Sequence, residues 1–216
     1  MIKKMREPIN ALTHLLGVLL SIIGLILLIH KSIIFDKSYN IPTFIIFGVS
    51  LILLYTASSV YHLVPGPDKI IKVLRKIDHS MIFILIAGTY TPVCLLALKG
   101  TLGIALLITI WVLALVGILF KMFWFNMPRW VSTSIYVIMG WLVIIAIYPL
   151  TKVLPLGGIL WLFIGGVFYT IGAIIYGTKK PTIFSKFLGF HEIFHLFVLL
   201  GSLCHFWVMF KYVMYI

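Results

Sequence analysis

The chain has 216 residues, of which 62% are hydrophobic and only 10% are charged. A soluble domain of this length needs a polar shell, and 17 basic plus 5 acidic side chains are too few to make one. The composition indicates an integral membrane protein and excludes a secreted disulfide scaffold, a soluble nucleic-acid binder and a disordered chain. The net charge of +12 comes from basic residues in short loops between apolar runs, so it indicates membrane orientation and lipid headgroups, not nucleic acid.

Seven apolar runs are each long enough to cross a bilayer, because a spanning helix needs about 20 mostly apolar residues. In chain order they cover roughly residues 11–30, 42–64, 77–98, 101–120, 131–148, 156–176 and 188–212. The breaks between them are short and carry Pro, Gly, Asn and Asp, so neighbouring helices should pack antiparallel. We therefore expect one domain, residues 1–216: an all-α bundle of seven transmembrane helices in the plasma membrane.

Lysine and arginine are unevenly divided between the two sides of this topology. Twelve fall at the N-terminus and in the second, fourth and sixth loops, and five fall on the other side. The positive-inside rule then predicts a cytoplasmic N-terminus and an external C-terminus. Lys3, Lys4 and Arg6 precede the first run as they would in a signal peptide, but no small-x-small cleavage site follows. We expect that run to be retained as the first span.

Ionisable side chains are costly in hydrocarbon and are usually functional there. Those inside the predicted spans are His14, His62, Asp78, His79, His191, Glu192, His195 and His205. His62 is near the inward end of the second span, and Asp78 is in the first turn predicted for the third. His191 and His195 are in the first two turns of the seventh. At a rise of 1.5 Å per residue, these four groups fall within about 10 Å of the same membrane face.

The spacing of these residues predicts a metal site. His191 and His195 are four residues apart and share one helix face, which suits two imidazoles on one metal ion. A third histidine, with a carboxylate or water, would complete tetrahedral zinc with an open position. Ser58 lies one turn before His62, where its hydroxyl can hold a ligand or a bound water. The alternative is that the histidines only form hydrogen bonds across helices. His205 lies about 20 Å or more beyond His191, so we expect it to be a poor ligand.

The stretch His191-Glu192-Ile193-Phe194-His195 also matches the H-E-x-x-H pattern of metalloproteases. A protease of that kind needs a further acidic ligand, and no later span supplies one. The pattern therefore favours a metal site over a protease. It leaves Glu192 either as a general base or as a residue of the cytoplasmic rim.

Several motifs together resemble the haemolysin III family, the bacterial branch of the progestin and adiponectin receptor superfamily. They run from near the N-terminus to the last span, so the resemblance covers essentially the whole chain. The matching residues are Glu7 with Asn10-Ala11-Leu12-Thr13-His14, Ser58-Ser59-Val60-Tyr61-His62, Lys76-Ile77-Asp78-His79-Ser80, Gly88-Thr89-Tyr90-Thr91-Pro92 and His191-Glu192-Ile193-Phe194-His195.

The resemblance implies seven spans, a cytoplasmic N-terminus and a zinc ion near the cytoplasmic face. By the family pattern His62, His191 and His195 would bind the zinc, and Asp78 would hold the water on it with Ser58 nearby. Relatives can carry Gln at the position of Glu192, which weakens a protease-like role for that residue. The superfamily includes alkaline ceramidases, which suggests hydrolysis of a lipid amide, and the family name reflects cytolytic activity.

Two functional hypotheses follow. The first is a zinc hydrolase that acts on a lipid amide or ester, with Asp78 and Ser58 as catalytic residues and Asp78 orienting or deprotonating the water. The second is a non-enzymatic membrane sensor, regulator or haemolysin in which zinc only joins helices. Under both, the partners are membrane lipids and not nucleic acid.

Overall fold

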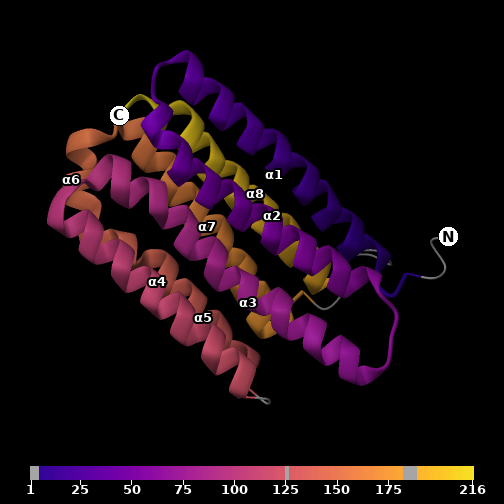
Figure 1. The fold of residues 1–216 in the computed structure, drawn as a ribbon. Coiled ribbons are helices and arrows are strands. Elements are labelled where there is room, and N and C mark those ends of the chain that lie inside the picture. Colours follow the sequence, from indigo (N-terminus) through magenta and orange to yellow (C-terminus); the bar gives the residue numbers. More distant parts are fainter. Residues whose placement is uncertain (1–4, 125–126, 182–188) are drawn as a thin grey trace.

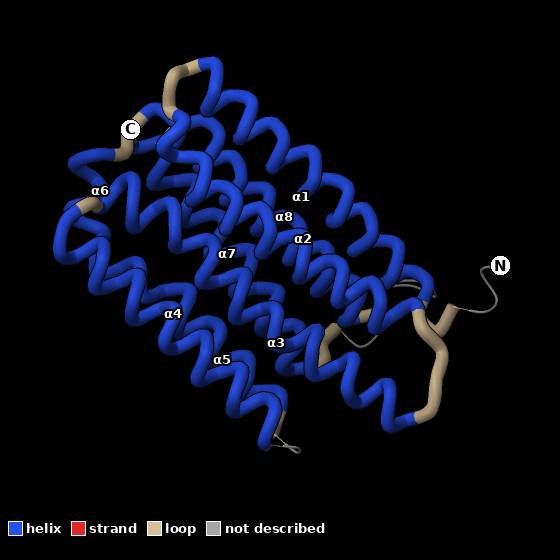
Figure 2. The backbone as a smooth tube through the Cα atoms, in the orientation of Figure 1, coloured by secondary structure: helices blue, strands red, loops and turns tan. Residues whose placement is uncertain are grey.

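The computed structural model of the chain describes residues 5–124, 127–181 and 189–216. In that part of the chain every regular element is helical, and seven helices are long and apolar enough to cross a membrane (Figure 1). The predicted all-α, seven-span architecture is confirmed. Figure 2 shows short loops between described helices at both ends of the bundle.

The spans consist of eight α-helices and some shorter helical turns. The turn Leu142–Ala146 joins α5 and α6 into one span, and the π-helical turn Val93–Leu98 extends α3 beyond Pro92. The helices are α1 (Pro8–Ile34), α2 (Ile41–Leu63), α3 (Asp68–Pro92), α4 (Gly100–Phe123), α5 (Arg129–Trp141), α6 (Ile147–Val153), α7 (Leu156–Thr178) and α8 (Phe190–Lys211).

The third span begins earlier than the sequence predicted. Helix α3 starts at Asp68, so Asp78 lies in its third turn and not in its first. The first turns are amphipathic: Lys69 and Lys72 are exposed, and the Lys76 ammonium donates to the carbonyl of Met122 at 2.7 Å. A search for apolar runs misses helix of this kind, because charged residues interrupt the run.

Some sequence predictions fall outside the described residues. These are the start of the last span at residue 188 and three of the twelve basic residues used for orientation, namely Lys3, Lys4 and Lys186. The orientation itself remains a prediction. The end of the bundle at which α2 finishes and α3 and α8 begin is called the N-terminal end below, because the chain starts there (Figure 1).

The spans are arranged as a ring. Helix α1 packs on α2, α2 on α3, α3 on α4, α5 on α7 and α7 on α8, and α8 closes the ring against α1. The two chain ends lie at opposite ends of the bundle (Figure 1). Helix α3 belongs to the most buried of the seven spans, whereas Ile104, Ile108, Leu115 and Leu119 of α4 are exposed on the outside, as suits hydrocarbon.

Glycines let neighbouring helices approach closely, as is usual in membranes. A Cβ atom added at Gly88 of α3 would lie 2.3 Å from the Ser50 hydroxyl oxygen of α2. A Cβ atom at Gly117 of α4 would lie 2.2 Å from the ring of Phe83 on α3. These contacts fix the separations of α2, α3 and α4, and thereby the wall that carries Ser58 and Asp78.

Candidate metal centre

Three histidines converge at the N-terminal end of the bundle. His62 is the penultimate residue of α2, and His191 and His195 are in the first two turns of α8. One ring nitrogen from each lies within 4.8 Å of the others, and their ring centroids are 4.8 to 4.9 Å apart. His62 and His195 are buried, with 0% and 1% exposure. The three residues, which the sequence predicted as ligands, form a group that can hold a metal ion.

Glu7 determines which nitrogen of His62 faces this group. The Nδ1 atom of His62 lies 2.6 Å from Oε2 of Glu7, and the Glu7 backbone N–H donates to the His62 carbonyl at 3.0 Å. The carboxylate fixes the proton on Nδ1, so the lone pair is on Nε2, which is buried and has no hydrogen-bond partner in the described structure. The hydrogen bond from His62 is the main cause that holds the pKa of Glu7 down at about 2.

A fourth histidine lies against the trio. The ring of His14 in α1 stacks on His195 with 3.6 Å between centroids and 16° between planes, and it lies nearly perpendicular to the ring of Tyr55, with 5.0 Å between centroids. His14 is 3% exposed, and neither of its ring nitrogens has a hydrogen-bond partner among the described residues. Thr13 places its hydroxyl oxygen 3.5 Å from Nδ1 of His195. Helix α1 therefore forms one wall of the site.

Sequence reasoning did not assign Glu7 or His14 to the site. Glu7 precedes the first span, and His14 is the single ionisable residue that the sequence places inside that span away from its ends. No spacing rule links either residue to α2 or α8. The signal that could have found Glu7 is general: metal-binding imidazoles usually donate their second N–H to a carboxylate.

Glu192 belongs to a polar network at the rim. Its Oε1 atom accepts from the Asn10 side-chain amide at 2.9 Å, and its Oε2 atom accepts from the backbone N–H of Gly189 at 3.0 Å. The Asn10 amide also lies 3.2 Å from Glu7, which Arg6 contacts at 3.2 Å. The Oε1 atom of Glu192 thus joins α1 to α8, and its Oε2 atom caps the start of α8. Of its two predicted roles, these contacts favour the rim residue over the general base.

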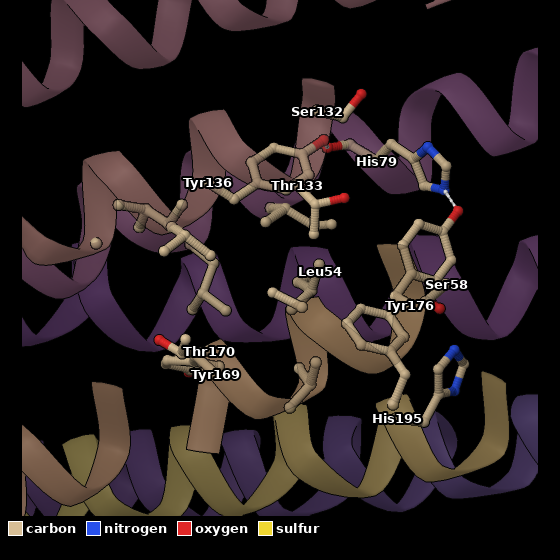
Figure 3. A pocket seen from close by; sticks show the side chains of 18 of the residues that line it. Leu54, Ser58, His79, Ser132, Thr133, Tyr136, Tyr169, Thr170, Tyr176 and His195 are labelled. Atoms are coloured by element: carbon tan, nitrogen blue, oxygen red, sulfur yellow. Dashed lines mark hydrogen bonds between the residues drawn. The ribbon is translucent and has the colours of Figure 1, made fainter. Parts of the chain in front are cut away.

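Asp78 and Ser58 lie beside the trio. Asp78 is 7% exposed and Ser58 is 1% exposed, and the two side chains are close enough to interact. The Asp78 carboxylate is 4.0 Å from Nε2 of His79, which in turn lies 3.2 Å from the Tyr176 hydroxyl (Figure 3). Asp78 lies outside the group of histidines but lines the same cavity as His191 and His195. Its role, and that of Ser58, stay predictions.

The cavity beside the histidines is long and mostly apolar. It has a volume of about 140 Å³, and all seven spans contribute to its lining. Figure 3 shows His79 and His195 on one side of the cavity and Tyr169 and Thr170 on the other. His205 lines the far part of the cavity. Along α8 it lies about 21 Å beyond His191, at a rise of 1.5 Å per residue.

Comparisons with known proteins agree with this architecture. The sequence model described as "Haemolysin-III related" matches residues 2–206. The chain is 45% identical over 206 residues to the Hemolysin-3 homolog of Bacillus subtilis, covering 95% of this chain and 93% of that protein. It is 43% identical over 209 residues to Hemolysin-3 of Bacillus cereus, covering 96% and 92%.

A more distant similarity reaches animal proteins. The human monocyte to macrophage differentiation factor is 25% identical over 207 residues, which cover 94% of this chain and 82% of that protein. The family match and the bacterial relatives span nearly the whole chain, and the seven apolar helices fit a multi-pass protein of the plasma membrane. The resemblance drawn from the motifs is therefore confirmed: the chain belongs to the haemolysin-III-related family.

Proposed function

We propose that the protein is a zinc-dependent membrane hydrolase that cleaves an acyl amide or ester. The observation that carries this proposal is the position of the histidine trio on the wall of an apolar cavity, beside a buried carboxylate and a buried hydroxyl. A site that only joined helices would need no adjoining space. A hydrolase for an acyl lipid needs room for the chain next to the carbonyl that reacts.

The donor set of the trio fits zinc. Three imidazoles plus one open position are typical of catalytic zinc sites, and a carboxylate behind one imidazole is a common supporting contact. The buried Nε2 atom of His62 without a partner is the kind of group that a bound cation would satisfy. Zinc–nitrogen bonds of about 2.0–2.1 Å place tetrahedral ligand atoms roughly 3.3 Å apart. The ring nitrogens of the trio lie up to 4.8 Å apart, so they would have to move closer together to bind zinc. Rotation of the side chains can supply this movement.

Zinc, when bound, would act as a Lewis acid toward water and toward the carbonyl of the substrate. The residues of the chain supply the rest of the chemistry. Asp78 would orient the attacking water and accept its proton, and Ser58 would hold the carboxylate in place. Water adds to the carbonyl carbon, the carbon–nitrogen or carbon–oxygen bond breaks, and the proton goes to the leaving amine or alcohol. The cavity would hold the acyl chain and exclude bulk water.

The test is release of fatty acid by the zinc-loaded protein in detergent, measured over a panel of acyl amides and esters. We expect turnover of at least one member, loss of turnover after removal of the metal by a chelator, and recovery when zinc is added back. Turnover that is unchanged in the metal-free protein would contradict the role of zinc. No turnover of any member by the zinc-loaded protein would contradict the hydrolase.

One observation favours a second candidate, a sensor or cytolytic protein in which the metal only joins helices. Asn10 and Glu192 already tie α1 to α8 at this end of the bundle, and a metal on His62 and His195 would add a link from α2 to α8. The bacterial relatives are named as haemolysins. Lysis of erythrocytes by purified protein, with and without zinc, tests this candidate directly.

A further inference from the structure

Two cationic side chains line the cavity at the N-terminal end of the bundle. Lys121 is in the last turn of α4 and Arg129 is the first residue of α5. All five acidic residues of the chain lie in the described part, and the ion pairs within 4.0 Å there join only Arg6 and His62 to Glu7, and His79 to Asp78. Among the described residues, therefore, Lys121 and Arg129 have no carboxylate within 4.0 Å, and the Asp78 carboxylate interacts with Lys121 only at longer range.

Their visible contacts are neutral. The Lys121 ammonium donates to the hydroxyl of Ser132 at 3.0 Å, and the Arg129 guanidinium lies 5.3 Å from the ring centroid of Tyr176. Ser132 and Thr133, in the first two turns of α5, line the same cavity (Figure 3). We call Lys121, Arg129, Ser132 and Thr133 the cationic mouth. An ammonium, a guanidinium and two hydroxyls are the donors that bind a carboxylate or a phosphate group.

The cationic mouth lies beside the proposed reacting groups, whereas the rest of the cavity is mostly apolar. Lys121 is close enough to Asp78 to interact with it electrostatically, and His79 and Tyr176 line the cavity between the mouth and the histidines. Beyond the histidines the lining includes Leu54, Leu85, Ile86 and Val198. An acyl chain that fills this apolar part and presents its carbonyl to the histidines would direct its leaving group toward the mouth.

We propose that the cationic mouth selects acyl amides whose amine portion carries an anionic group, a carboxylate or a phosphate, over neutral amides of the same chain length. This inference rests on the proposed function, because that function determines that the acyl chain lies in the apolar part of the cavity and the amine portion at the mouth. Binding itself requires no turnover. General attraction of the basic loops to lipid headgroups does not explain the arrangement, because Lys69 and Lys72 are exposed and do not line the cavity.

The test compares two probes that share an acyl chain and an amide bond, N-decanoylglycine and N-decanoylethanolamine. Equilibrium binding of each radiolabelled probe is measured on the zinc-loaded parent, on the double variant Lys121→Gln/Arg129→Gln and on the control Lys69→Gln/Lys72→Gln. The control removes the same charge from exposed positions of α3.

We expect the parent to bind the glycine probe at least about tenfold tighter than the ethanolamine probe, as one charge-assisted contact supplies. The double variant should lose this preference while its affinity for the ethanolamine probe stays the same, and the control should keep the preference. Equal binding of the two probes by the parent overturns the inference. So does a preference that survives in the double variant, since the glycine carboxylate would then bind elsewhere, for example to the metal.

Two further measurements distinguish this inference from binding of bilayer headgroups and from the proposed hydrolase activity. In nanodiscs of phosphatidylcholine, added phosphatidylglycerol should not displace the glycine probe; displacement would assign the mouth to bilayer headgroups and overturn the inference. Hydrolysis of both probes is followed in parallel. Selective binding that depends on the mouth, without any release of decanoate, would support the anion site while counting against the hydrolase.

Discussion

The Nδ1 atom of His62 and the Oε2 atom of Glu7 lie 2.6 Å apart, although 55 residues separate them in the chain. Glu7 precedes the first span, and His62 is at the end of the second. The contact places the short segment before α1 within the candidate metal centre. Because the carboxylate fixes the proton on the far side of the ring, His62 presents an unprotonated Nε2 without any cost of tautomer selection when a cation arrives.

Replacing Glu7 should therefore weaken metal binding without removing a ligand. We expect Glu7→Gln to lower zinc affinity by roughly tenfold to a hundredfold, because a neutral acceptor makes the imidazole less basic. Competition with a chromophoric chelator measures the affinity. Asp68→Asn, an exposed acid at the start of α3, serves as the control and should bind zinc like the parent. Parental affinity in Glu7→Gln would show that the contact does not support the metal.

Removing a ligand should have a larger effect. We expect about one zinc per chain in the parent, and its loss in His62→Ala, His191→Ala and His195→Ala, since two imidazoles leave the coordination shell incomplete. His205→Ala removes a histidine from the far part of the same cavity and should keep the metal. Metal analysis of purified protein checks this. Zinc lost from His205→Ala but kept in His62→Ala would reverse the assignment.

Asp78→Asn should separate catalysis from metal binding. The amide has nearly the shape of the carboxylate but cannot accept a proton as a general base. Since Asp78 lies outside the histidine trio, we expect the variant to keep its zinc content and melting temperature and to lose hydrolysis of any substrate that the parent turns over. A joint fall in zinc content and melting temperature would instead identify Asp78 as a direct ligand.

Two glycines that differ in their surroundings test the packing of the bundle. Glycine to alanine usually stabilises the interior of a helix by about 1 kcal/mol. At Gly88 the new methyl group would meet Ser50 at 2.3 Å, so we expect Gly88→Ala to destabilise the protein by about 1–3 kcal/mol. Nothing lies within 4 Å of the corresponding position at Gly140, so Gly140→Ala should be neutral or stabilising. Thermal unfolding in one detergent compares the two variants.

The orientation in the membrane is predicted from the charge distribution and needs a separate test. We expect a reporter that is active only in the cytoplasm to work when fused to the N-terminus and to fail when fused to the C-terminus. The two ends lie at opposite ends of the bundle, so a single pair of fusions is sufficient (Figure 1). Cytoplasmic activity of the C-terminal fusion would mean that the histidines lie near the outer face.

The sequence predicted what depends on local pattern. Apolar runs located the seven spans, and the four-residue spacing of His191 and His195, together with the depth of His62, located the trio. It did not predict the early start of α3, because the first turns of this helix are amphipathic and their charged residues interrupt any continuous apolar run. Nor did it predict the contacts of Glu7 and His14, because these depend on how the ring of helices closes, which no spacing along one helix reveals.

Because α8 closes the ring of helices against α1, the site can form only after the last span has been made. The stacked pair of His14 and His195 joins the first span to the last, so the centre is incomplete until nearly the whole chain has been translated and inserted. At about 5–20 residues per second, the ribosome takes roughly 7 to 27 seconds to pass from His62 to His195. Capture of a metal by these histidines would therefore be a late step of biogenesis, and a nascent chain that lacks α8 would not have the complete group of ligands.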